Sequence, residues 1–233
     1  MRRLAYASLL LIAVLLLAGT LYWGGLSPSP DPAGLTRPGT TAAVSGLQRA
    51  GEASFYGATL DPPRAAPDFS LADQHGGRFR LSEQKGDVVV LFFGYTSCPD
   101  VCPGTLAQYR HVKRTLGEEA ERVQFIFVTV DPERDSRERL YEYINLFDPE
   151  FKALWGELEE LQAVWRAYGV YVEKVDAPGS SAGYLVNHTS VSYVIDTDGN
   201  LRLIHLYGMP DDQVIHDLKR LIAEGKSDAE GGA

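Results

Sequence analysis

The chain holds two cysteines, and both lie in one short segment, Cys98-Pro99-Asp100-Val101-Cys102. Such a pair forms a structural disulfide, exchanges disulfides, or supplies two thiolate ligands to one metal ion. A bridge that closes so short a loop restrains little of the unfolded chain, which argues against a purely structural role. In a helix, residues four apart lie on one face about 6 Å apart along the axis, which suits both a disulfide and a shared ion. The spacing alone leaves these two uses open.

The elements around the cysteines favour a reactive role. Residues 87–95 are an almost continuous apolar run, which is typical of a strand buried on both faces. We expect a helix over residues 103–116, opened by Pro103 and ended by Gly117. The partial positive charge at the start of a helix lowers the pKa of a nearby thiol and favours the thiolate.

The rest of the folded part alternates strands and helices. The predicted strands are residues 69–71, 78–81, 123–130, 190–195 and 201–207, and the predicted helices are residues 135–147, 157–168 and 211–223. We expect Asp135 to cap its helix, with Glu138 three residues on. This order predicts an α/β fold of the thioredoxin type, with three layers and a central mixed sheet flanked by helices. Open α/β sheets place their sites at the carboxyl ends of strands, where the cysteines fall.

The chain begins with an uncharged apolar run, residues 4–23, that follows Arg2 and Arg3. As a helix this run spans about 30 Å, the thickness of the hydrocarbon core of a bilayer. We therefore expect residues 1–24 to anchor the chain in the cytoplasmic membrane with the arginines inside. A cleaved signal peptide is the alternative. Either way, the remaining chain lies on the extracytoplasmic side.

Composition divides the remainder and excludes several classes of protein. Residues 25–53, rich in Pro, Gly, Ser and Thr, predict a flexible linker, residues 54–224 a folded domain, and residues 225–233 a disordered tail. The net charge of −9 argues against binding to nucleic acid. Two cysteines are too few for a small domain held together by disulfides.

Three stretches resemble the Sco/SenC family. Residues 92–103, FFGYTSCPDVCP, are similar to the characteristic cysteine segment of that family. Residues 130–136, VDPERDS, resemble the family segment that follows a strand. Residues 186–190, VNHTS, which lead into YVID at 193–196, resemble its histidine loop and the next strand. The resemblance covers about residues 67–221.

This resemblance implies a membrane-tethered copper metallochaperone that delivers copper to the binuclear CuA site of cytochrome c oxidase. It implies one ion per chain, Cu(I) or Cu(II), held by Cys98, Cys102 and His188. The implied partners are the oxidase subunit that carries CuA, a copper donor protein and a thioredoxin-like reductant. The implied location is a single pass through the cytoplasmic membrane, with the domain in the periplasm. Thiolates suit Cu(I) and an added imidazole suits Cu(II), whereas structural zinc usually takes four protein ligands.

Two enzymatic readings compete with the chaperone. A thiol–disulfide reductase would use Cys98 and Cys102 as a redox-active disulfide to keep the copper-binding cysteines of the oxidase reduced. A peroxidase is disfavoured, because the P-x-x-x-T-x-x-C pattern around its nucleophile is missing from the sequence. The chain also departs from many family members at Asn187, where they have aspartate, so this position supplies no negative charge.

Other residues near these motifs receive simpler roles. We expect Tyr95 to pack over the site, and Arg134 to shape the loop after the second core strand. The remaining histidines, which we interpret as structural or exposed, are His75, His111, His205 and His216.

Overall fold

The structure, a computed structural model, describes residues 54–179 and 182–231. The predicted anchor and linker, residues 1–24 and 25–53, fall outside this part of the chain. Among the helices that are described, we find none with the length and apolar character needed to cross a membrane.

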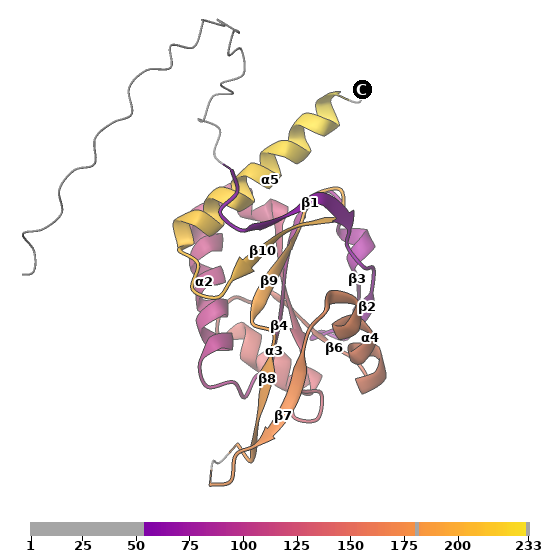
Figure 1. Cartoon of the computed structure of the whole chain (residues 1–233), viewed down its shortest axis with the longest axis vertical. Coiled ribbons are helices and arrows are strands. Elements are labelled where there is room, and N and C mark those ends of the chain that lie inside the picture. The colour runs from indigo at the N-terminus through magenta and orange to yellow at the C-terminus, as the bar shows by residue number, and fades with distance from the viewer. Residues whose placement is uncertain (1–53, 180–181, 232–233) are drawn as a thin grey trace, which may run out of the picture. The chain divides into compact units, whose positions relative to one another are not determined.

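An eight-stranded mixed sheet organises the domain (Figure 1), with the strand order β1-β10-β9-β4-β5-β6-β2-β3. Its strands are β1 (Ala58–Ala65), β2 (Ser70–Asp73), β3 (Arg78–Arg80), β4 (Val88–Gly94), β5 (Val123–Thr129), β6 (Lys152–Trp155), β9 (Val191–Ile195) and β10 (Asn200–Leu206). β4, β5 and β6 run parallel, and the other neighbours pair antiparallel. All seven residues of β4 are buried, as its continuous apolar run predicted.

Helices cover both faces of this sheet. They are α2 (Val101–Leu116), α3 (Arg137–Asn145), α4 (Leu158–Tyr168) and α5 (Asp211–Gly231), with the 3-10 turns η1 (Leu81–Gln84) and η2 (Gly117–Arg122). Tyr109 of α2 packs on Phe125 and Tyr143 of α3 packs on Phe127, so both helices lie on one face of β5. α5 packs beside α2 on that face (Figure 1).

The opposite face of the sheet is covered by α4. Tyr168 of this helix packs on Phe93, which points away from the face that Phe92 shares with Phe127. α4 lies within the predicted helix 157–168, and Glu157 caps it through a capping box with Glu160. The predicted thioredoxin-like arrangement of three layers around a mixed sheet is therefore confirmed.

Two strands form a separate hairpin, β7 (Val172–Asp176) and β8 (Tyr184–His188). In Figure 1 it extends from the end of the domain opposite the C-terminal end of α5. The sequence predicted a loop around His188, whereas this residue is the last of β8. Most of β7 is exposed, and its sequence, VEKVD, lacks the strict alternation of apolar and polar residues that marks a strand buried on one face. The sequence pattern therefore did not predict this strand.

The start of α3 differs from the prediction. The capping residue is Ser136, whose hydroxyl oxygen accepts a hydrogen bond from the Arg139 N–H at 3.2 Å. Asp135 instead turns into the core, where it is fully buried. Both residue types are good caps, so the pattern alone could not separate neighbours.

The last helix extends beyond the predicted end of the folded domain. α5 runs to Gly231, and the predicted tail begins at residue 225. Gly225 does not stop the helix; it lets the helix pass close to the Thr197 side chain, which would clash with a Cβ atom at this position.

A buried carboxylate fastens β1 to α5. Asp217 of α5 accepts hydrogen bonds from the backbone N–H groups of Tyr56 and Gly57, at 2.9 and 2.8 Å, and from His205 Nε2 at 3.1 Å. Burial raises the pKa of Asp217, but the hydrogen bonds from His205, Tyr56 and Gly57 outweigh it and hold the pKa below its usual range.

Asp217→Asn is expected to lower the free energy of unfolding by about 2 kcal/mol near neutral pH, because a charged acceptor for several buried donors is lost. A lowered pKa in the folded state means that the carboxylate stabilises the protein above its ordinary pKa of about 4. This stabilisation disappears as the pH falls through the lower folded value. Urea unfolding of both proteins across this pH range measures the effect; an equal difference at every pH would contradict it.

Candidate metal centre

The cysteines lie at the carboxyl end of β4, where the chain turns into α2. Cys98 is in the connecting loop and is partly exposed, whereas Cys102 lies in the first turn of the helix and is fully buried. Both thiols are free. The helix begins at Val101, two residues before the predicted start, so Cys102 belongs to the helix itself.

Close packing beneath β4 seats the sulfur of Cys102. A Cβ atom at Gly94 would lie 2.9 Å from Cys102 Sγ and 2.7 Å from a carbon of the Phe127 ring. Both separations are shorter than an ordinary nonbonded contact, so a larger residue at position 94 would displace the sulfur or the ring. The sequence showed Gly94 beside the cysteines without indicating this role.

The two sulfurs differ in protonation. A hydrogen bond from the Cys102 thiol lowers the pKa of Cys98, and the backbone N–H groups of Asp100 and Cys102 add to this against the effect of burial. The same Cys98–Cys102 hydrogen bond, together with burial and the charge on Cys98, raises the pKa of Cys102. At neutral pH Cys98 is therefore a thiolate and Cys102 a thiol.

His188 meets the cysteines from the hairpin. Its Nε2 atom lies 3.6 Å from Cys102 Sγ, although the two residues are 86 positions apart in sequence. Its Nδ1 atom lies 3.0 Å from the carbonyl oxygen of Thr189. Since a carbonyl only accepts, Nδ1 carries the proton and the Nε2 lone pair faces the sulfur. This is the tautomer and orientation that a metal-binding histidine uses.

Aromatic rings hold the imidazole in place. The Tyr95 ring stands edge-on to the His188 ring at 5.8 Å between centroids, and the Phe92 ring does so at 6.3 Å. The expected packing of Tyr95 over the site is therefore observed. The Tyr95 hydroxyl also accepts a hydrogen bond from the Val186 N–H at 3.3 Å, which ties the hairpin to the cysteine loop.

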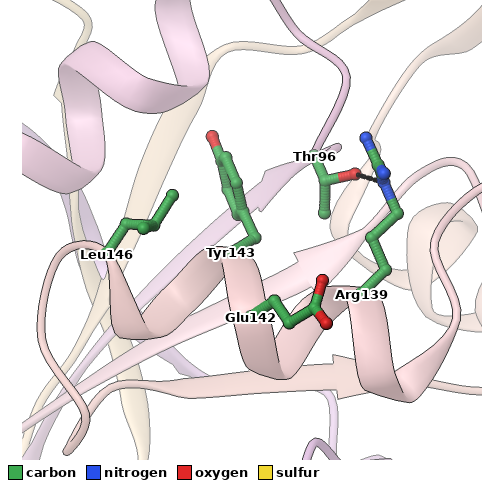
Figure 2. A pocket seen from close by; sticks show the side chains of 5 residues that line it. All are labelled: Thr96, Arg139, Glu142, Tyr143 and Leu146. Atoms are coloured by element: carbon green, nitrogen blue, oxygen red, sulfur yellow. Dashed lines mark hydrogen bonds between the residues drawn. The ribbon is translucent and has the colours of Figure 1, made fainter.

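A buried polar cluster supports the loop before Cys98. Asp135 accepts hydrogen bonds from the N–H and hydroxyl of Thr96, at 3.1 and 2.6 Å, and from the Thr129 hydroxyl at 2.7 Å. Arg139 Nε donates to the Thr96 hydroxyl at 2.7 Å, and Figure 2 shows this contact in a pocket that Tyr143 also lines. Burial raises the pKa of Asp135 despite these donors. This support was missed from the sequence, because its only signal was a second aspartate in the DPERDS segment.

The three predicted ligands thus gather in one place, while the other histidines have separate partners. His75 packs on Tyr141, His111 faces Asp211, His205 is buried against Asp217, and His216 packs on Tyr56. Over residues 54–179 and 182–231, no group of three His, Cys, Asp or Glu side chains is already arranged tightly enough to hold a metal ion. Of the three predicted ligands, Cys102 and His188 are therefore already in contact, and Cys98 lies within hydrogen-bonding reach of Cys102.

Comparison with known proteins identifies relatives of this chain. The sequence profile of the SCO1/SenC family matches residues 57–223. A SCO2-like protein of Rickettsia felis is 33% identical over 158 residues, which cover 68% of this chain and 75% of that protein. The structure of Bradyrhizobium japonicum ScoI with copper bound is 36% identical, with a TM-score of 0.62, and covers 67% of this chain and 99% of that one.

A second solved structure, the apo Sco1 protein from Thermus thermophilus, is 38% identical with a TM-score of 0.65. It covers 73% of this chain and 99% of that chain. The fold and the paired cysteines define a thioredoxin-like protein with a thiol-containing site. The chain belongs to the SCO1/SenC family.

Alkylation tests the difference between the two sulfurs. In the reduced chain at about pH 6, iodoacetamide is expected to modify Cys98 well before Cys102, because only the thiolate reacts and Cys102 is buried. Cys102→Ala removes the donor, raises the pKa of Cys98 and slows its alkylation roughly tenfold or more. Cys102→Ser keeps a donor and is expected to restore most of the rate. Peptide mass spectrometry measures the extent of alkylation at each cysteine. Equal labelling of both would contradict the assignment of Cys98 as thiolate and Cys102 as thiol.

Proposed function

We propose that this chain is a copper metallochaperone that binds one copper ion through Cys98, Cys102 and His188. The observation that carries the proposal is the approach of His188 Nε2 to Cys102 Sγ, with the nitrogen lone pair directed at the sulfur. The separation of 3.6 Å is close to that of two ligands around one ion, given metal–sulfur and metal–nitrogen bonds of about 2.3 and 2.0 Å.

The donor set suits copper as a cargo. Thiolate sulfur favours Cu(I), and an imidazole extends the site to Cu(II). Binding needs the Cys102 thiol to lose its proton, so loading releases protons and depends on the reduced form of the pair. Cys98 is already a thiolate and partly exposed, so it is the first ligand that an arriving ion meets.

The destination of the copper follows from the family resemblance. We propose that the acceptor is the CuA-bearing subunit of cytochrome c oxidase, with a copper donor protein and a thioredoxin-like reductant as further partners. Residues 1–24 would anchor the chain in the cytoplasmic membrane, and residues 25–53 would let the domain reach the acceptor on the periplasmic side.

A thiol–disulfide reductase remains a second candidate, favoured by the unequal cysteines. The Cys98 thiolate would attack one sulfur of a substrate disulfide, releasing the other sulfur as a thiolate. Cys102 would then lose its proton and attack Cys98, freeing the second substrate sulfur and leaving a Cys98–Cys102 disulfide. The substrate gains the two electrons that the cysteine pair gives up.

Replacement of His188 separates the two functions. His188→Ala is expected to weaken copper binding by about 100-fold or more, since loss of a ligand exceeds the roughly 10–100-fold effect of losing a group that orients one. Thiol exchange through the cysteines is expected to persist. Anaerobic titration of the reduced full chain with Cu(I), in competition with a chromogenic chelator, measures the affinity.

The matched control is His75→Ala, which removes an exposed imidazole away from the cysteines and is expected to change neither activity. Wild-type copper affinity in His188→Ala would show that the ligand assignment is wrong. Loss of both activities in Cys98→Ser is expected under either function.

A further inference from the structure

The hairpin that carries His188 needs an attachment of its own. β7 and β8 pair only with each other, and in the described part of the chain neither joins the backbone ladder of the eight-stranded sheet. The short connection from His188 to β9, which begins at Val191, and side-chain contacts of β8 together set where His188 lies relative to the cysteines. One cluster of such contacts lies at the other end of β8, at Tyr184, four residues from His188.

A buried carboxylate anchors that end of the hairpin. Asp131 follows β5, and its side chain is fully buried. It accepts a hydrogen bond from the Tyr184 hydroxyl at 2.7 Å on one oxygen and from Arg134 Nε at 2.5 Å on the other. The buried charge is thus neutralised and both oxygens have partners, which such a group requires.

Arg134 extends this contact to the hairpin backbone. Its Nη1 group donates to the carbonyl oxygens of Ala182 and Tyr184, at 2.8 and 2.9 Å. The guanidinium carbon lies 3.6 Å from the centroid of the Tyr184 ring, in a cation–π contact. One guanidinium therefore holds a carboxylate of the core, two carbonyls and a ring of the hairpin at once.

Strand geometry transmits this position to His188. Alternate residues of a strand share a face, so Tyr184, Val186 and His188 point to the same side. Val186 is buried there and donates to the Tyr95 hydroxyl. Four residue steps place the anchored tyrosine about 13 Å from His188 along the strand. β8 is thus held at Tyr184 by Arg134 and at Val186 by the Tyr95 hydroxyl.

We infer that Asp131, Arg134 and Tyr184 are positioning residues, which hold His188 at the distance from Cys102 that a shared metal ion requires. The inference rests on the proposed function and adds residues outside the ligand set. Among them Arg134 is decisive, because a lysine keeps the charge but lacks the planar group that reaches the carboxylate and both carbonyls together.

The test compares Arg134→Lys with Arg122→Lys in the full chain. Arg122 is a matched control: it faces Asp87 and donates to the Gly86 carbonyl, away from the hairpin. We expect Arg134→Lys to weaken copper binding about 10–100-fold, as for other groups that orient a ligand. We also expect a changed thiolate-to-Cu(II) charge-transfer band, with Cys98 alkylation as in the wild type. Arg122→Lys is expected to alter none of these.

A measurement without copper distinguishes failure of the positioning role from failure of the proposed function. In the metal-free chain, proton NMR contacts between the His188 and Tyr95 rings are expected to weaken in Arg134→Lys and to persist in Arg122→Lys. If the wild type bound no copper, the proposed function would fail, and these contacts would still decide the positioning role. If Arg134→Lys does not fold, Tyr184→Phe removes only the hydroxyl and is expected to weaken binding roughly 3–10-fold. Wild-type ring contacts, affinity and spectrum in folded variants would overturn the inference.

Discussion

The meeting of a sulfur and an imidazole nitrogen from distant parts of the chain is the constraint on which the rest of the site depends. Cys102 is fixed by the first turn of α2 beneath β4, and His188 by a hairpin outside the main sheet. Their side chains meet because Tyr95, at the end of β4, contacts both the imidazole ring and the hairpin backbone. The contact between Cys102 and His188 therefore needs the helix, the hairpin and Tyr95 together.

Much of this arrangement could be predicted from the sequence. The apolar run of β4 and β5 identified the buried strands, because only a strand covered on both faces tolerates so many β-branched and aromatic residues in succession. The position of the cysteines between a strand and a helix predicted that they lie at the carboxyl end of a central strand. Resemblance to a family then singled out His188, which its local sequence alone does not distinguish from the other histidines.

Other parts depend on long-range contacts that local pattern does not encode. β1 contains two prolines, is mostly exposed and pairs with β10 across a register shift, so it lacks the alternation of an ordinary strand. Asp135 has the sequence context of a cap, yet its carboxylate accepts hydrogen bonds from Thr96 and Thr129 in the core. Asp131 is likewise fully buried, and it accepts a hydrogen bond from Tyr184, 53 positions away in the sequence.

The contacts that hold His188 and Cys102 differ in kind, and this determines which of the two side chains can shift. Displacing the hairpin breaks side-chain contacts while the main sheet stays whole, whereas displacing Cys102 disturbs the packing under Gly94. His188 can therefore be displaced with less disturbance of the domain than Cys102. A movement of the hairpin would thus shift the imidazole while Cys102 keeps its place beneath β4.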